Sequence, residues 1–254
     1  MAKAAGRIRE YLRAVDVVLE VVDARIARSG RNPLLGKLAG KRRRVVALER
    51  EDLADPKTTR QWLSFFRDAG TEALAVDGRA ARKVADVATA VTRSCAEGRG
   101  IARAMVVGIP NSGKSTLVNA LLRRAAAKTE DRAGITRDLQ WFRLSPNVEL
   151  MDTPGVLPVK TPSEAARWKL AICGAVPSNR YDPQEVTAAF YGWLLARSPR
   201  TQVPDLQAYA ARRGFVRRGG EVDYHNAARS YIRAFNEGVF GRISLESPDD
   251  AEAA

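Results

Sequence analysis

The chain has 254 residues, of which 45% are hydrophobic and 28% charged, so its composition is that of a folded globular protein and not of a disordered one. Its 42 Lys and Arg against 29 Asp and Glu give a formal net charge of +13, which favours a polyanionic partner, first of all nucleic acid, over an acidic one; a charge that only maintains solubility is the alternative. The sequence has no run of about 18 apolar residues and no signal-peptide core at its start, which excludes a membrane-spanning or secreted protein and predicts a cytoplasmic one.

Strands and helices alternate along the first half of the chain. Apolar runs predict strands at 15–23, 44–48, 72–76 and 102–108, and amphipathic stretches predict helices at 2–13, 56–69, 80–95 and directly after residue 108. Such alternation is typical of βαβ units, so we expect a mainly parallel sheet.

The second half begins with a hairpin and then becomes helical. Two short strands are predicted at 139–144 and 148–151, followed by helices at 163–173, 183–196, 204–213 and 224–237. Gly and Pro interrupt the helical periodicity at 175–182. We therefore expect an α/β nucleotide-binding domain over 1–175 and an all-α domain over 176–254, with a frayed tail at SPDDAEAA (247–254).

The segment GIPNSGKS (108–115) fits the phosphate-binding pattern G-x-x-x-x-G-K-[ST] and lies between a predicted strand and a predicted helix. Its glycines let backbone N–H groups surround a phosphate, Lys114 reaches the β- and γ-phosphate oxygens, and Ser115 binds Mg²⁺. A glycine-rich turn is the alternative. The residues predicted to hold the nucleotide here are Gly108, Asn111, Ser112, Gly113, Lys114, Ser115 and Thr116.

Two further motifs follow in the order of a P-loop GTPase. The strand VELM ends in DTPG (152–155), where Asp152 can hold Mg²⁺ through water and Gly155 can face the γ-phosphate. Between the motifs, Thr136 is the candidate second hydroxyl ligand of Mg²⁺ and, with Lys114, a candidate catalytic residue; no general base is identified. Alone, DTPG is a turn and Thr136 an ordinary loop residue.

The base-reading box N-K-x-D is missing downstream of DTPG, where the sequence is helical, so it has to be sought upstream. LEREDL (48–53) follows a predicted strand and can occupy that position. With this loop, the chain resembles the ribosome biogenesis GTPase A family, whose members are circularly permuted GTPases. The segments that carry the resemblance are DARIARSGRNP (23–33), LEREDL, GIPNSGKSTLVN, GITRDLQWF, MDTPGVL and FNEGVFGRISLESP (235–248).

The resemblance implies a Ras-like, mainly parallel sheet with permuted connectivity and a C-terminal all-α domain. It implies a protein that binds GTP and GDP with Mg²⁺ and works on the precursor of the large ribosomal subunit, where contact with rRNA stimulates hydrolysis. It further implies that Asn111 coordinates K⁺ beside the phosphates. We expect a ribosome-associated monomer in the cytoplasm.

The base-reading loop departs from the family. Glu49 and Arg50 replace its Asn and Lys, and only Asp52 is retained. An ionised Glu only accepts hydrogen bonds, whereas guanine presents the acceptors O6 and N7, so the preference for guanine should weaken. Arg50 can stack on the base; a solvated Glu49–Arg50 surface pair is the alternative. Val76 and Asp77, at the end of the next strand, are also predicted to contact the nucleotide.

Hydrolysis is the second departure. Val156 stands where many GTPases have a water-orienting glutamine. The family supplies a histidine from before a MAKA-like sequence, whereas this chain starts with MAKA, so we expect either a longer natural start or slow hydrolysis by the protein alone. Two alternatives stay open: a nucleotide-binding RNA scaffold that does not hydrolyse, and a P-loop ATPase in which Glu49 accepts from adenine N6. Arg28 replaces a small residue and is interpreted as a change of surface charge.

Clustered cations make RNA the expected partner. The clusters are KRRR (41–44), Arg123–Arg124, Arg212–Arg213 and Arg217–Arg218. Clusters of this kind give salt-dependent phosphate contacts, which we expect chiefly from the helical domain. Phe215 and Tyr224 are either stacking partners for bases or, as the commoner case, core residues.

Overall fold

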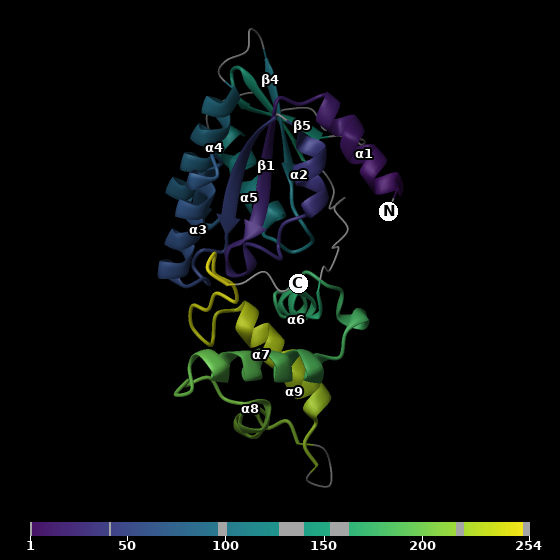
Figure 1. Ribbon diagram of the computed structural model, residues 1–254, viewed down its shortest axis with the longest axis vertical. Coiled ribbons are helices and arrows are strands. Elements are labelled where there is room, and N and C mark those ends of the chain that lie inside the picture. The colour runs from purple at the N-terminus through teal and green to yellow at the C-terminus, as the bar shows by residue number, and fades with distance from the viewer. Residues whose placement is uncertain are drawn as a thin grey trace.

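The computed structural model describes residues 2–40, 42–95, 101–126, 140–152, 163–216 and 221–250. A six-stranded sheet with helices on both faces forms one part of the molecule, and a group of helices forms the other (Figure 1). No helix within these ranges is long and apolar enough to cross a membrane.

The sheet has the strand order β3-β2-β1-β4-β6-β5, and only β5 runs antiparallel to its neighbour. Its strands are β1 (Val17–Asp23), β2 (Arg43–Glu49), β3 (Glu72–Val76), β4 (Ala102–Val107), β5 (Gln140–Ser145) and β6 (Val148–Asp152). Since β1, β2, β3 and β4 are parallel, the loops that follow them meet at one edge of the sheet. Ligand sites of open α/β sheets lie at this carboxyl edge.

Helices cover both faces of the sheet because its central strands are apolar on both sides. The helices of this part are α1 (Ala2–Arg13), α2 (Pro33–Ala39), α3 (Pro56–Asp68), α4 (Ala81–Cys95) and α5 (Lys114–Ala126). On β1, Leu19 points into a core shared with α4 and α5, whereas Val18 and Val22 point into cores shared with α1, α2 and α3. This alternation explains why all seven residues of β1 are buried.

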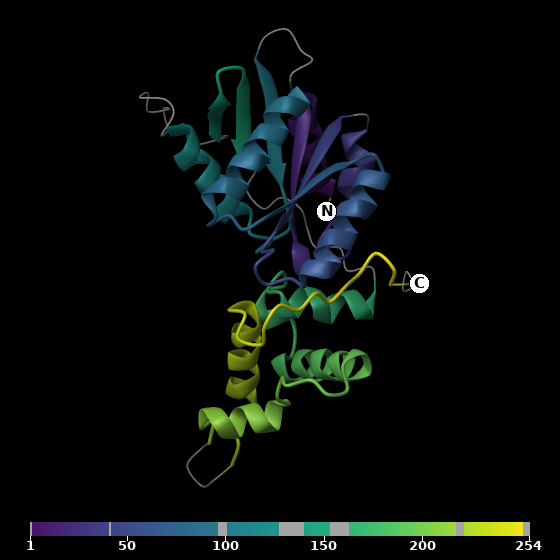
Figure 2. The same ribbon diagram turned by 90° about the vertical axis from the view of Figure 1, so that its left-hand side faces the viewer.

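The second part consists of α6 (Glu164–Ile172), α7 (Pro183–Arg197), α8 (Leu206–Arg213) and α9 (Tyr224–Asn236), which pack on an aromatic core. Ser163, Asp182, Asp205 and Asp223 cap the four helices by accepting from backbone N–H groups. Figures 1 and 2 show that α6 lies closest to the sheet, followed by α7 and then α8. The C-terminal end of α9 points towards the carboxyl edge of the sheet (Figure 1).

The last described residues, Arg242–Asp250, form a C-terminal strap that lies on the sheet part. Its hydrogen bonds are Arg242 Nε to Ala54 O (2.8 Å), Ile243 N to Leu53 O (2.9 Å), Leu245 N to Arg25 O (2.8 Å) and Trp62 Nε1 to Glu246 O (3.1 Å). The buried Glu246 carboxylate also accepts from the backbone N–H groups of Arg28 and Ser29, at 2.9 Å each. The strap therefore joins the end of the chain to the loops after β1 and β2.

All six predicted strands and all eight predicted helices are present, with ends shifted by a few residues. The short helix α2 and the 3-10 turns Ala24–Ile26 and Ser178–Arg180 escaped prediction because they are too short to show a periodicity.

Two expectations about the surface are wrong. Residues 247–250 of the supposedly frayed tail are bound, because the Arg28 side chain donates to the carbonyl oxygens of Pro248 (2.9 Å) and Asp250 (2.6 Å). Arg28 is consequently a structural tether and not a change of surface charge. Residues 251–254 lie outside the described ranges.

Candidate nucleotide-binding site

The predicted phosphate loop joins β4 to α5 at the carboxyl edge of the sheet, as its motif requires. A Cβ atom on Gly108 would lie 2.7 Å from both Ser112 Oγ and Val21 O, so only glycine fits there. Gly113 has φ +91°, and a Cβ atom on it would collide with the Glu49 carboxylate. The two glycines thus let the backbone fold tightly enough to present its N–H groups to a phosphate.

The loop's polar side chains differ in their surroundings. Asn111 adopts φ 58° and donates through Nδ2 to Gly174 O, just after α6, at 2.6 Å. The Ser112 hydroxyl is buried and has no hydrogen-bond partner within the described ranges. Ser115 and Thr116 lie exposed in the first turn of α5. The predicted residues therefore gather around one loop, which the helical part touches through Gly174.

Lys114 meets the end of β6. Its Nζ atom lies 2.6 Å from Asp152 Oδ1, and only 11% of its side chain is exposed. The structure therefore brings together the P-loop lysine and the acidic residue predicted to assist Mg²⁺ binding. Thr136, Gly155 and Val156 lie outside the described residues. Within the described residues, no group of three or more His, Cys, Asp and Glu side chains is arranged to hold a metal ion.

A cavity of about 510 Å³ adjoins the phosphate loop and has the position of a base site. Its walls come from the loops after β2 and β3, from the phosphate loop and α5, and from the helical part. The lining residues are Glu49, Arg50, Asp52, Leu53, Asp77, Arg79, Asn111, Thr116, Cys173, Gly174, Asn236 and Glu237. The predicted base-reading residues thus lie together. Asn236 at the end of α9 and Glu237 directly after it add two polar groups from the FNEGVFGRISLESP segment that had not been assigned to the nucleotide site.

Glu49 is buried under the phosphate loop, with 3% of its surface exposed. Its Oε1 atom accepts from Gly78 N at 3.1 Å, which connects the loop after β3 to the base-reading loop. Burial raises the pKa of Glu49 to about 7, and the Gly78 N–H and the Arg50 charge oppose this rise only in part. The alternative of a solvated Glu49–Arg50 pair is wrong, and so is the assumption of a fully ionised Glu49.

Arg50 has φ 60° and lies between two acids. Its Nη1 atom is 3.8 Å from Asp23 Oδ2, and its Nε atom is 4.0 Å from Glu49 Oε2. The left-handed backbone conformation turns the chain sharply after β2 and leads into the segment that carries Asp52. Arg50 therefore shapes the base-reading loop as well as lining its cavity.

Asp52 forms an ion pair with Arg79, which also binds Asp77 with Nε 2.9 Å from Oδ1. Burial acts to raise the pKa of Asp77, but the hydrogen bonds and charge of Arg79 lower it further than burial raises it. Sequence reasoning missed Arg79 because no motif marks it. Val76, predicted to contact the nucleotide, has its side chain in the sheet core, and its carbonyl accepts from Glu51 N at 3.3 Å.

A buried polar network joins the loop after β1 to α9. The Arg25 guanidinium is 1% exposed and donates from Nη2 to Asp23 Oδ2 at 2.7 Å and to Asn236 Oδ1 at 3.0 Å. Burial acts to lower the pKa of Arg25, but the charge and hydrogen bond of Asp23, together with Cys173 and Asp52, raise this pKa by more. Asn236 also donates to Ile172 O at 2.7 Å. This network fixes the helical part beside the base cavity.

The two cysteines, Cys95 and Cys173, are free and buried. Burial raises the pKa of Cys95 to about 11 and that of Cys173 to about 12. Although Cys173 lines the base cavity, its thiol stays protonated near neutral pH and contributes only an apolar wall.

Comparison with known proteins places this architecture. Residues 103–181 match the family described as 50S ribosome-binding GTPase. Ribosome biogenesis GTPase A of Priestia megaterium is 34% identical over 276 residues, which cover 99% of this chain and 96% of that protein. A GDP-bound structure of TM YlqF has a TM-score of 0.77 at 29% identity and covers 96% of this chain and 100% of its own. GNP-bound YlqF from T. maritima has the same TM-score at 28% identity, with 98% and 100% covered.

The likeness to the Priestia protein extends over nearly the whole length of both chains, and the phosphate loop lies where the fold requires it. The protein described here is therefore a guanine-nucleotide-binding GTPase that belongs to the ribosome biogenesis GTPase A family.

Proposed function

We propose that this GTPase is an assembly factor for the large ribosomal subunit and that the ribosomal particle stimulates its hydrolysis of GTP. The observation that carries the proposal is the end-to-end likeness to proteins named ribosome biogenesis GTPase A. The net charge of +13 supports an RNA partner. We place the protein in the cytoplasm, as a monomer that associates with precursor subunits.

In this proposal residues 1–175 form the GTP-binding domain and residues 176–254 the domain that binds RNA. The base-reading loop follows β2 and the phosphate loop follows β4, so the base is read by a segment that precedes the phosphate loop in the chain. This order supports a circular permutation. Helices α7 to α9 lie in the second domain, and α7 and α9 pack against α6, which precedes the boundary. Contacts of Gly174, just after α6, and of Asn236 in α9 connect these helices to the nucleotide site.

At the phosphate end, the N–H groups of the loop surround the β-phosphate and Lys114 binds the β- and γ-phosphate oxygens. Ser115, Thr136 and Asp152 would hold Mg²⁺, which would supply positive charge beside the phosphates. The tight cradle at Gly108 and Gly113 and the buried, unpartnered Ser112 hydroxyl support a ligand with oxygen acceptors there.

Asn111 coordinates K⁺ beside the phosphates. This part of the proposal rests on family resemblance, and equal hydrolysis rates in sodium and potassium buffers of the same ionic strength would remove it.

At the base end, Asp52 accepts hydrogen bonds from N1–H and the 2-amino group of guanine, which adenine lacks. Glu49, when protonated, has one O–H donor, and so it can donate to the O6/N7 edge of guanine as an amide would. Arg50 stacks on the ring, and the loop ends of β2 and β3 close the cavity around it. The preference for guanine is thereby retained despite the altered motif.

Two measurements test the proposal. Cosedimentation of the protein with immature large subunits should require GTP or a slowly hydrolysed analogue and should fail with GDP. Single-turnover hydrolysis should accelerate when such subunits are added. Absence of cosedimentation would refute the ribosomal role, cosedimentation without hydrolysis would favour the RNA scaffold, and equal competition by ATP and GTP for a fluorescent analogue would favour an ATPase.

A further inference from the structure

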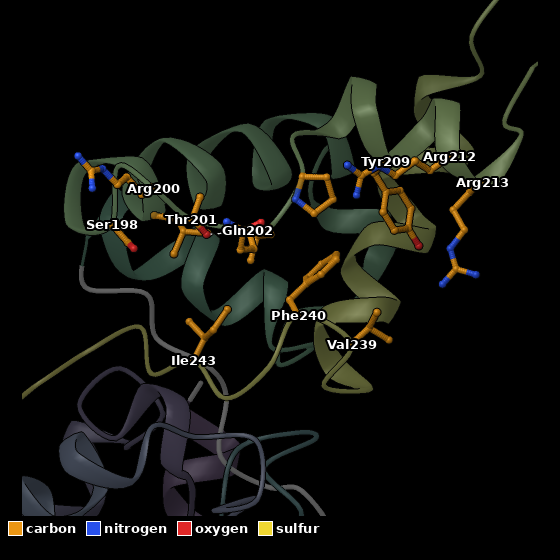
Figure 3. Close-up of a pocket in the computed structure, with 13 residues that line it drawn as sticks. Ser198, Arg200, Thr201, Gln202, Tyr209, Arg212, Arg213, Val239, Phe240 and Ile243 are labelled. Carbon is orange, nitrogen blue, oxygen red and sulfur yellow. Dashed lines mark hydrogen bonds between the residues drawn. The ribbon is translucent and has the colours of Figure 1, made fainter.

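A second cavity of about 640 Å³ lies in the helical part, and its lining shares no residue with the base cavity. Its walls are the end of α7 with the segment that follows it, α8, and the segment after α9 (Figure 3). We propose that this basic pocket, defined by Arg200, Gln202, Arg212, Arg213, Val239 and Phe240, binds one unstacked nucleotide of RNA. The inference rests on the proposed ribosomal function and adds a site and a mode of contact to it.

The charge of the basic pocket is uncompensated. Three arginines line it, and its lining contains no Asp or Glu. Neither Arg200 nor Arg212 forms an ion pair with a carboxylate of the described residues, whereas the Arg213 guanidinium lies 5.7 Å from the centre of the Tyr209 ring. Figure 3 shows Arg200 at one end of the pocket and Arg213 at the other. Guanidinium groups placed in this way suit phosphates on both sides of a bound nucleotide.

The ring of Phe240 is the platform for the base. The centre of this ring lies 4.6 Å from the ring centre of Tyr231 and 6.0 Å from that of Tyr209, so packing holds the Phe240 ring in place. The side of Phe240 that faces the pocket remains accessible, and the adjacent Val239 is 56% exposed (Figure 3). An ordered aromatic ring beside uncompensated arginines is the usual arrangement for an unstacked base.

Tyr209 supports the platform and is not itself one. It is 4% exposed, and its hydroxyl is hydrogen-bonded to Ser230 Oγ at 2.9 Å. On the opposite wall, Thr201 N donates to Ser198 O at 3.0 Å and Thr201 Oγ1 accepts from Val203 N at 3.2 Å, which orders the turn. The exposed amide of Gln202, next in this turn, can both donate to and accept from the edge of a base. An inorganic anion would use the arginines but neither the ring nor the amide.

The basic pocket and the base cavity share one segment of chain. Asn236 and Glu237 line the base cavity, and Val239 and Phe240, one residue further along, line the basic pocket. Ile243 lines the basic pocket as well and donates its N–H to Leu53 O of the base-reading loop. If a ligand at one site shifted this segment, the other site would change as well, and by linkage the effect on affinity would be equal in both directions.

The test measures binding by the full chain, with a slowly hydrolysed GTP analogue, of a short single-stranded RNA and of the same strand paired with its complement. The double substitution R212Q/R213Q should weaken binding of both and lower the slope of log affinity against log salt by roughly 1.4 for the single strand and 1.8 for the duplex. The control R60Q/R67Q removes two exposed arginines of α3 and leaves the same net charge. It should keep the wild-type slope; equal slopes in the two variants would overturn the site.

Phe240→Leu keeps an apolar side chain but removes the ring. It should lower the affinity for the single strand by about five- to 150-fold and leave that for the duplex unchanged. Val239→Glu adds a carboxylate at an exposed position, so folding is unaffected, and it should weaken both complexes. If both variants bound the single strand as tightly as the wild-type protein does, the proposal would be overturned.

Cosedimentation separates this proposal from the larger one. If wild type and both variants cosediment equally with large subunits, the basic pocket is not used, and the proposed function stands. If wild-type protein does not cosediment at all, the proposed function itself fails. If only the variants lose cosedimentation, both proposals are supported.

Discussion

The two ends of the nucleotide site are built in different ways. At the phosphate end the proposed contacts come from the backbone, which can fold tightly because Gly108 and Gly113 have no side chain. At the base end the proposed contacts come from the side chains of Glu49 and Asp52, whose chemistry depends on burial and on neighbours such as Arg79. A site formed by the backbone keeps its contacts when neighbouring side chains are replaced. A site formed by side chains can change its ligand preference through a single substitution.

The largest effect is expected where the backbone has no alternative. Gly113→Ala should abolish measurable GTP binding, because a side chain at φ +91° is strained and would collide with Glu49. Calorimetry with GTP measures this loss. Gly192→Ala is the matched control, since Gly192 lies in α7 with nothing near its would-be Cβ. It should bind GTP like wild type, and a Gly113→Ala protein that also did so would show that the phosphate end is not built as described.

Asp52→Asn should produce the next largest effect, about a five- to 150-fold loss of GTP affinity, because one acceptor for the guanine edge disappears. ITP lacks the 2-amino group, so the preference for GTP over ITP should disappear with it. Glu72→Gln removes the same charge at the opposite end of β3, where Glu72 pairs with Arg93, and should keep the preference. An unchanged GTP-to-ITP ratio in Asp52→Asn would show that another residue reads the base.

Glu49 should make the free energy of unfolding fall as pH rises, whereas most acidic side chains make it rise. Because its pKa is about 7 in the folded protein and 4.5 ordinarily, the folded state retains a proton that the unfolded state has lost between these values. Stability should therefore fall as pH rises through this window, by on the order of 3 kcal/mol, and Glu49→Gln should remove this fall. Denaturant unfolding of both proteins at several pH values measures the difference, and parallel curves would contradict it.

The same titration should affect base reading. Between pH 6 and pH 8 the neutral fraction of a group with a pKa near 7 falls about tenfold, and GTP affinity should fall by up to that factor. Glu49→Gln keeps an N–H donor at all pH values and corrects for titration of the nucleotide itself. If wild type and Glu49→Gln show the same pH dependence, Glu49 does not donate to the base.

The smallest effect is expected where the helical part touches the base-reading loop. Arg242 donates from Nε to Ala54 O at 2.8 Å and from Nη2 to Glu51 O, both in that loop. Arg242→Gln should lower GTP affinity by about two- to tenfold, since two hydrogen bonds that order the loop are lost. Arg233→Gln, on the exposed face of α9, is the control, and equal affinities of the two variants would show that the strap does not order the base end.

How far the sequence could predict the site follows from the same contrast. The order of strands and helices is visible because periodicity is local, and the phosphate loop is visible because its glycines are needed wherever the loop occurs. The protonation state of Glu49 could not be predicted, because its burial depends on Gly78 and Gly113, which lie far away in the chain. Arg79 and the network of Arg25 with Asn236 were missed for the same reason, since each depends on a contact between distant segments.

The strap that covers α3 also provides an optical probe. Trp62 is 2% exposed and donates its indole N–H to Glu246 O, so detachment of the strap would bring this ring into water. The emission of Trp62 would then shift to longer wavelengths. In a variant whose other tryptophans, Trp141, Trp168 and Trp193, are replaced by Phe, the fluorescence would come from Trp62 alone. Its emission wavelength would then report in real time whether the strap stays attached while the enzyme turns over.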